Sequence, residues 1–510
     1  MDIAMFLWRF IRGLFEAPAP TVPPVDGPTL VSLPGDILGL IFEYIRELET
    51  PANVEEPYGN ERLIGAPLIP LSMTCRQLRA FARGWIFAEM YNWDRGGGFI
   101  WPETLWPVFR TLHIRDRAVR DSQPIVIPQQ LWPSLASMDA IQSLTLRISV
   151  PVSCSILQHL DRIPHLRKLD IYEARLDDAN WGDLPRLRSL STLSLRVSGF
   201  LSGRRPPDVD RATELGNVDT LLHHLSAQLN ELCISGELVS PQFSRIHWPA
   251  LCIFAVRDER PVPFVSISQL TQHMPHLAEW RALFAMFIPT EWPHERPTIG
   301  DADAPYVAGP RLASVSISNW NADDPIFVQL PDTLEGLRLV DVQARHEISW
   351  SFRTVPYPLV GTIARISHLR NLRKLELTSA VQAMPDELWK LAESFPLLVE
   401  LSMNHRIYWE ERLTWVDEHL NECMEPLRAL QNLKHLRVTI HFTIYIDYRG
   451  VPVYGAYRVL ESVPQLERVS FRGAQDPDVL PKWDTWNRSI LAGSCPPPRP
   501  GYPDIEEDDR

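Results

Sequence analysis

A short apolar pattern recurs along most of this 510-residue chain and constrains its fold more than any other feature. Each copy has an apolar residue, two variable residues, a second apolar residue, one variable residue and a third apolar residue. Thirteen copies follow one another at spacings of 22 to 39 residues, and their second apolar residues are Leu112, Leu144, Leu169, Leu193, Leu232, Phe254, Trp280, Val315, Leu337, Leu375, Leu401, Leu436 and Val469. In a strand, residues two apart point to the same side, so each copy predicts a strand with one apolar face. A single copy cannot bury that face alone, so neighbouring copies must stack.

The segments between the copies predict helices and loops. Helical periodicity occurs at residues 152–163, 218–229, 385–395 and 457–463, whereas residues 203–216, 287–309 and 342–358 predict loops or insertions. In six copies a proline stands two residues before the first apolar residue: Pro164, Pro249, Pro275, Pro310, Pro396 and Pro464. Proline ends a helix and favours an extended residue before it. The whole pattern resembles leucine-rich repeats, which implies a curved α/β solenoid of about 13 irregular repeats over residues 100–472.

Two short amphipathic helices are predicted ahead of the repeats. The first carries Leu33, Ile37 and Ile41 on one stripe, and Pro34 stands in its first turn, where proline is tolerated. The second carries Cys75 and Leu78 on its apolar side. A helical bundle this small buries little surface, so it needs a partner or a neighbouring domain to complete its core. A plain helical hairpin that caps the repeats is one interpretation of these residues.

The order of residues in both helices is similar to the F-box, a three-helix module that binds the Skp-type adaptor of cullin-based ubiquitin ligases. The matching segments are Leu33-Pro34, Ile37-Leu38-x-x-Ile41-Phe42 and Thr74-Cys75-Arg76-x-Leu78-Arg79. The resemblance implies that the adaptor-facing surface consists of Leu33, Pro34, Ile37, Leu38, Ile41 and Phe42. Residues 47–66 form a longer link between the two halves than is usual in the family, and a polar surface loop of this kind costs little free energy.

These segments together predict four parts. Residues 1–28 form an apolar helix and a Pro-rich linker, 29–92 the F-box, 100–472 the repeats, and 473–510 a disordered, acidic and Pro-rich tail. The chain therefore resembles a substrate receptor of a Skp-cullin-F-box ubiquitin ligase. The resemblance implies three partners: a Skp-type adaptor, a cullin scaffold held through it, and an unknown protein substrate. The alternative is a leucine-rich-repeat interaction scaffold that transfers no ubiquitin.

Composition and the lack of catalytic motifs argue against other classes. The net charge of −13 disfavours binding to nucleic acid and to anionic membranes. The six cysteines include no C-x-x-C pair, which favours reduced thiols in the cytoplasm or nucleus and predicts no zinc site. No nucleophile elbow, Gly-rich phosphate loop or H-E-x-x-H motif occurs, so we expect no enzyme activity, metal or cofactor.

Residues 1–15 are too short an apolar run to span a bilayer. They predict an amphipathic helix that packs on its own protein, with an interfacial membrane anchor as the alternative.

Arginine is common at the variable positions of the predicted strands, against the negative charge of the whole chain. The arginines that we consider candidates for substrate binding are Arg115, Arg147, Arg196, Arg257, Arg281 and Arg338. Guanidinium groups suit bidentate capture of carboxylate or phosphate, so this face predicts an acidic or phosphorylated substrate segment. The other interpretation is a solvated face on which each arginine pairs with an acid of a neighbouring strand.

Overall fold

The computed structural model describes the repeats and little of the chain before them. The described residues are 87–91, 103–115, 130–148, 151–172, 175–178, 181–197, 209–258, 266–284, 299–300, 311–340, 359–379, 385–405, 417–440, 451–473 and 483–491, with Leu38, Leu78, Arg83 and Ile127. The chain divides into two compact units, Met1–Ser149 with Ser155–Leu169, and Val150–Cys154 with Asp170–Arg510.

The first unit contains three parallel strands in chain order. These are β1 (Glu89–Tyr91), β2 (Thr111–Arg115) and β3 (Ser143–Arg147), with η2 (Glu103–Val108) and α5 (Leu131–Leu135) between them. Leu112 and Ile114 of β2 and Leu144 and Leu146 of β3 are fully buried. The division between the units falls at α6 (Cys154–Leu160) and within β4 (Lys168–Tyr172).

The second unit continues the same alternation of strand and helix. Its strands are β5 (Thr192–Arg196), β6 (Glu231–Ser235), β7 (Ile253–Asp258), β8 (Glu279–Phe284), β9 (Ser314–Ser318), β10 (Gly336–Val340), β11 (Lys374–Ser379), β12 (Glu400–His405), β13 (His435–Ile440), β14 (Arg468–Gly473) and β15 (Trp483–Asn487). Its helices are α7 (Arg211–Leu225), α8 (Ile267–Thr271), α9 (Ile326–Gln329), α10 (Leu359–Ile366), α11 (Pro385–Ser394), α12 (Asp417–Ala429), α13 (Val451–Ser462) and α14 (Arg488–Leu491), with the 3₁₀ turns η3 (Gly236–Leu238) and η4 (Phe243–Arg245).

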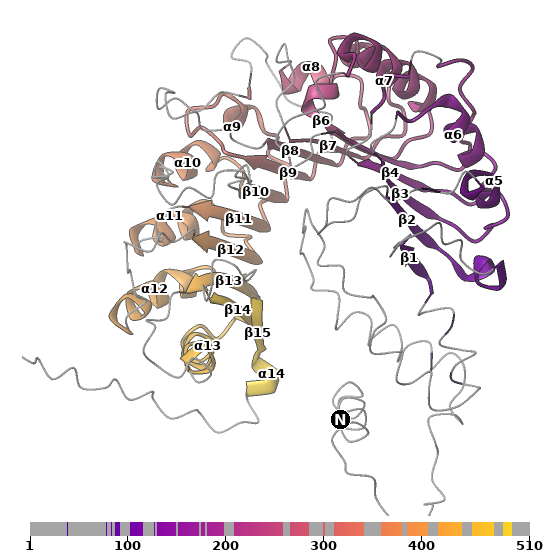
Figure 1. Ribbon diagram of the computed structural model, residues 1–510. Helices are drawn as coiled ribbons and strands as arrows, with labels where there is room; N and C mark the ends of the chain where they lie inside the picture. The colour runs from indigo at the N-terminus through magenta and orange to yellow at the C-terminus, as the bar shows by residue number, and fades with distance from the viewer. Residues whose placement is uncertain are drawn as a thin grey trace, which may run out of the picture. The chain divides into compact units, whose positions relative to one another are not determined.

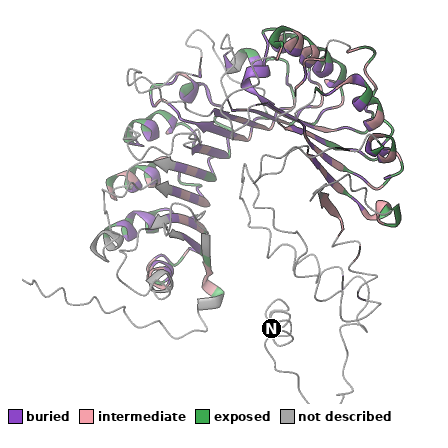
Figure 2. Ribbon diagram, in the orientation of Figure 1, coloured by how far each residue is buried: buried purple, intermediate pink, exposed green. Residues whose placement is uncertain are grey.

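Strands β5 to β14 pair in parallel and in chain order, and β15 pairs with β14 antiparallel (Figure 1). Helices α10, α11, α12 and α13 follow one another along one side of strands β10 to β14 (Figure 1). The buried residues of α11 include Leu388 and Leu391. Buried and exposed residues alternate along the helices of this part of the chain (Figure 2). This arrangement is a stacked α/β repeat solenoid, because each strand contacts chiefly the strands of the repeats before and after it.

One backbone interaction repeats at the start of almost every strand. The amide of the first strand residue and the amide before it both donate to the carbonyl that precedes the previous strand. At β7, Cys252 N and Ile253 N lie 2.8 and 3.0 Å from the oxygen of Asn230, and at β13, Lys434 N and His435 N lie 2.9 and 3.0 Å from that of Val399. The same pair of bonds occurs at β2 to β4 and from β6 to β14. It fixes the register of each strand on the one before it.

The thirteen apolar patterns correspond to β2 through β14, so the predicted repeat strands are confirmed. The end of the repeats differs from the prediction. Residues 483–491, assigned from sequence to a disordered tail, form β15 and α14 because β15 pairs with β14 and Trp486 packs on Phe471 with ring centroids 5.5 Å apart. Helix α7 also begins inside the predicted loop 203–216, because Asp210 accepts hydrogen bonds from the amides of Ala212 and Thr213 and caps the helix.

The predicted F-box lies largely outside the described residues. Within it, Leu38 and Leu78 are helical and buried, and Arg83 is helical and half-buried. Its predicted end, at residue 92, includes β1, a short strand of the sheet that the helical prediction did not contain. Within the described residues, no helix combines the length and the apolar character that a membrane span requires.

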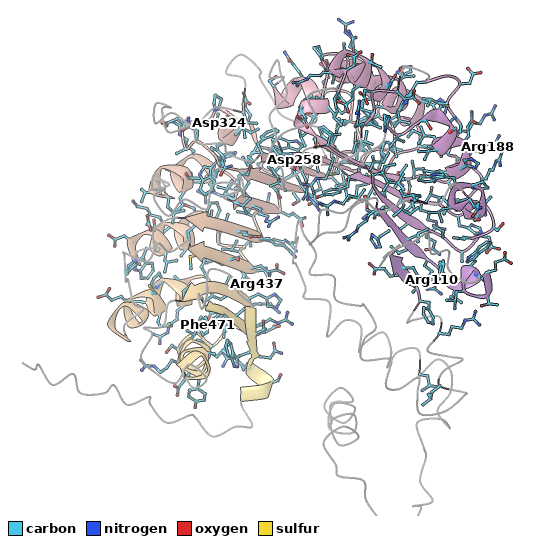
Figure 3. The ribbon with its side chains drawn as sticks, viewed as in Figure 1. Arg110, Arg188, Asp258, Asp324, Arg437 and Phe471 are labelled. Carbon is cyan, nitrogen blue, oxygen red and sulfur yellow. The ribbon has the colours of Figure 1, made fainter. Side chains whose placement is uncertain are left out.

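A buried carboxylate after β9, that of Asp324, binds a segment of the connection between β8 and β9. Asp324, labelled in Figure 3, is 1% exposed. It accepts hydrogen bonds from the amides of Ile299, Gly300 and Ile326, at 2.7 Å for Gly300 and 3.0 Å for Ile326. Gly300 passes so close that a Cβ atom there would lie 2.4 Å from the amide nitrogen of Ile326. The close approach therefore requires glycine.

We expect Gly300→Ala to lower the free energy of unfolding by about 1–3 kcal/mol, because the added methyl group overpacks the backbone at Ile326. Chemical denaturation of the full chain measures the change. Gly182→Ala is the matched control, since a Cβ atom at Gly182 meets nothing within 4 Å, and it should stay within about 0.5 kcal/mol of the wild type. Equal stability of both variants would contradict the close contact.

Candidate protein-binding face

In each unit the described helices pack on one side of the strands, and we call the other side the variable face. It consists of the first, third and fifth residues of β2 and β3 in the first unit and of β5 to β14 in the second, with Tyr172 at the end of β4. The second and fourth residues are buried toward the helices, as Leu436 and Val438 of β13 illustrate, each 2% exposed. Side chains at equal positions of paired strands lie side by side about 4.8 Å apart. The variable face therefore presents three rows of mostly polar side chains.

A buried charged cluster occupies this face at β4 to β7. Arg196 donates to both carboxylate oxygens of Asp258, with Nη2 2.7 Å from Oδ1 and Nε 3.3 Å from Oδ2. Ser235, on the strand between them, donates its hydroxyl to Asp258 Oδ2 at 2.6 Å. Arg196 also donates to the hydroxyl of Tyr172 and stacks on its ring, 4.5 Å from the centroid. The four side chains thus connect four successive strands.

Burial and charge both act on this cluster. The side chains of Arg196 and Asp258 are only 11% and 3% exposed. Burial lowers the pKa of Arg196, but the charge of Asp258 and the Tyr172 hydroxyl outweigh it and hold that pKa above its ordinary value. Burial raises the pKa of Tyr172 to about 12, and the neighbouring Arg196 only partly offsets it. Asp258 has a left-handed backbone (φ 67°), a conformation that Asp tolerates better than most residues.

The other predicted arginines occupy the same face. Arg281 contacts Glu279 of its own strand at 2.7 Å, and Arg338 contacts Glu376 of β11 at 3.0 Å. Arg257 is half-buried beside Asp258 at the end of β7. In the first unit, Arg115 and Arg147 are half-buried and directly opposite each other in the register of β2 and β3. Arg196, Arg281 and Arg338 are thus each engaged with a carboxylate of the protein, and substrate binding by the six remains a prediction.

The face is differently charged at β11 to β14. Glu400 lies 3.1 Å from Lys374 Nζ and 3.5 Å from His435 Nδ1. Arg468 donates to the side-chain oxygen of Asn487 on β15 at 3.1 Å. Arg437, labelled in Figure 3, is the third residue of β13 and is not one of the six candidate arginines. The signal that could have identified it is the pair of serines, Ser402 and Ser470, at its own position on the neighbouring strands.

None of the four described thiols, Cys154, Cys233, Cys252 and Cys423, belongs to a disulfide. Burial raises the pKa of Cys423 to about 12 and the pKa of Cys233 above its ordinary value. A buried thiol with a raised pKa is a poor nucleophile at neutral pH. In the part of the chain that the structure describes, no three His, Cys, Asp or Glu side chains are placed to hold a metal ion.

The predicted adaptor-binding residues lie outside the described residues, with one exception. Leu33, Pro34, Ile37, Ile41 and Phe42 belong to this undescribed group. The exception is Leu38, which is helical and 4% exposed.

No protein-family model matches the sequence, and no curated protein is significantly similar to it. Solved structures that match parts of this chain include the following two. One is a chain in the crystal structure of the TLR13–ssRNA13 complex, with 12% identity and a TM-score of 0.28 over 71% of this chain and 36% of that one. The other is a chain in the crystal structure of the mouse RP105/MD-1 complex, with 10% identity and a TM-score of 0.32 over 75% of this chain and 62% of that one. This chain thus covers less than two thirds of either protein. Neither similarity identifies a family, and the assignment of a repeat solenoid rests on the strand order and the buried pattern.

We expect Asp258→Asn to lower the free energy of unfolding by about 3 kcal/mol, because it leaves the buried charge of Arg196 without a counterion. Asn also tolerates the left-handed backbone, so the change in the free energy of unfolding reflects the loss of the negative charge and not backbone strain. Asp323→Asn is the matched control. It removes an equally short ion pair with Arg365, at 2.6 Å, but the two side chains are 79% and 40% exposed, so a change of at most about 1 kcal/mol is expected. Denaturant titration of both variants measures the difference.

Tyr172 should make the stability of the protein depend on pH in alkaline solution. Its folded-state pKa of about 12 lies above the value near 10 in an unfolded chain, so folding favours the neutral phenol. This contribution is fully present below pH 10 and is lost as the pH rises toward 12. Tyr172→Phe should therefore lose less stability than the wild type between pH 10 and 12, measured by denaturant titration. If the free energy of unfolding fell equally with pH in the wild type and in Tyr172→Phe, the buried phenol at this position would be contradicted.

Proposed function

We propose that this chain is a non-enzymatic protein-binding receptor, the substrate-recognition subunit of a Skp-cullin-F-box ubiquitin ligase. The observation that carries the proposal is the order of its parts: a pattern similar to the F-box, followed by stacked repeats with a polar variable face. In this role the N-terminal module holds the Skp-type adaptor and, through it, the cullin. The repeats hold the substrate.

The geometry of the repeats supports a binding role. Their helices pack on one side of the sheet, and the variable face offers rows of Arg, Glu, Ser and His at fixed spacing. A rigid, polar surface of this kind suits recognition of a protein segment, since charged rows steer and orient a partner. The burial of Leu38 and Leu78 in helices agrees with a packed helical module in residues 29–92.

The absence of catalytic patterns in the sequence favours a receptor over an enzyme. The proposed compartment is the cytoplasm, the nucleus or both, where a reduced chain meets the adaptor and the cullin. No nucleic acid, cofactor or metal has a part in this function. Recognition by the repeats has no transferable code, so the substrate must be found by experiment.

The second candidate function is a repeat scaffold that binds partners without ubiquitin transfer. The sequence favours it at one point, the long link at residues 47–66 between the two halves of the F-box pattern. The two functions differ in one measurable outcome. Cullin-dependent ubiquitination of a bound protein is expected of the receptor and not of the scaffold.

We expect the double substitution Leu33→Ala with Pro34→Ala to abolish co-purification of the Skp-type adaptor. Truncating an apolar anchor at an interface costs about 2 kcal/mol or more, which is at least a 25-fold loss of affinity. The repeats should stay folded, as circular dichroism can verify. Val328→Ala is the control, because Val328 is an apolar side chain of α9 that is 61% exposed and remote from the F-box pattern in sequence. Unchanged recovery of the adaptor with the double variant would refute the assignment.

A further inference from the structure

Arg437 differs from the other basic side chains of the variable face. It is the third residue of β13 and half-buried (Figure 3), whereas its neighbours Leu436 and Val438 are each 2% exposed. Arg196, Arg281, Arg338, Lys374 and Arg468 each have a carboxylate or amide partner. Arg437 has neither an ion pair nor a hydrogen bond with any side chain in the described part of the chain. Its charge is thus partly withdrawn from water and uncompensated.

The strands on both sides of β13 leave room around this guanidinium group. Ser402 of β12 and Ser470 of β14 stand at the same position as Arg437, one strand away on either side. The hydroxyl groups of Ser470 and Thr485 of β15 form a hydrogen bond of 2.9 Å. Ser402 is half-buried, and its hydroxyl has no partner among the described side chains. Two short side chains cannot cover the long arginine between them. A residue with a hydroxyl group and one with a guanidinium group therefore occupy adjacent positions on paired strands.

The nearby acids are already engaged. On the row of Arg437 the nearest acid is Glu376, two strands away, and it is paired with Arg338. On the adjacent row, Glu400 lies between Lys374 and His435. The strand of Arg281 shows the contrast: it carries Glu279 two residues before the arginine, where β13 carries His435 before Arg437. Among the described side chains of β11 to β14 on this face, Lys374, Arg437 and Arg468 outnumber the acids Glu376 and Glu400.

We propose that Arg437 and Ser402 bind one anionic side chain, a phosphate or a carboxylate, of an extended segment of the substrate protein. The inference rests on the proposed function in that it assigns the segment to a substrate. The guanidinium donates two parallel hydrogen bonds to the anion, and the Ser402 hydroxyl donates a third. Charge complementarity favours this occupant, because an anion supplies the counterion that Arg437 lacks.

Three pools of nine-residue peptides test the proposal, with phosphoserine, Glu or Ser at the central position and mixed residues elsewhere. Binding to the full chain is measured by fluorescence anisotropy. We expect the wild type to bind the phosphoserine pool or the Glu pool at least about tenfold more tightly than the Ser pool, and the preferred pool identifies the anion. Arg437→Gln, which keeps the length of the side chain, should lose this preference, since one charge-assisted contact is worth about a factor of ten in Kd. Arg365→Gln on α10 is the control and should keep it.

Two outcomes overturn the proposal: equal binding of all three pools by the wild type, or an unchanged preference in Arg437→Gln. A third arm truncates the chain after Pro503, which removes its own acidic end. Tenfold tighter binding after truncation would assign the site to that end instead of a substrate. Adaptor co-purification is scored separately on the same samples. If the adaptor fails to bind while the peptide preference stands, the ligase function is refuted and the anion site is retained.

Discussion

The structure depends on a backbone carbonyl oxygen that, in almost every repeat, accepts hydrogen bonds from two amides of the next repeat. At β8, for example, Ala278 N and Glu279 N both donate to the oxygen of Cys252, at 2.8 and 3.0 Å. A backbone carbonyl has two lone pairs, so it satisfies both donors at the point where the chain enters the strand. Because the bond involves only backbone atoms, it tolerates almost any side chain at these positions. It therefore repeats through units whose lengths differ by many residues.

The side-chain arrangement follows from this fixed register. A shift of one residue would exchange the buried and the variable faces of a strand, so the apolar pattern and the paired amides specify the same alignment. Once the strands are aligned, charges meet across strands at predictable heights, as Arg338 and Glu376 do. The Arg196–Asp258 pair shows how far this extends. It joins residues 62 positions apart and passes over an intervening strand, whose Ser235 supplies a further hydrogen bond.

The sequence predicts the repeated strands well because burial of two apolar residues per strand leaves a regular pattern. It fails where that pattern is short or absent. Strand β1 has only three residues, and β15 carries two tryptophans, three residues apart, among polar residues after a break in the repeats. The variable face is predicted in its composition but not in its pairing. Which arginine finds a carboxylate depends on neighbouring strands and side-chain reach, so Arg196 is a buried structural residue and Arg437 is uncompensated, although both look alike in the sequence. The hydrogen bonds of Asp324 could not be predicted from the sequence either, because the three amides that donate to it come from two separate segments.

The reversed direction of β15 has a consequence for the protein in a crowded cell. A parallel ladder that ended at β14 would present the same row of amides and carbonyls that each repeat offers to the next, and a second molecule could continue it. Head-to-tail growth of this kind leads to filaments when the contact does not close on itself. The antiparallel strand occupies that row and presents a different hydrogen-bonding pattern beyond it, so a parallel strand of another copy finds no matching template. At the last described strand, the reversed direction thus replaces the parallel edge that head-to-tail growth would require.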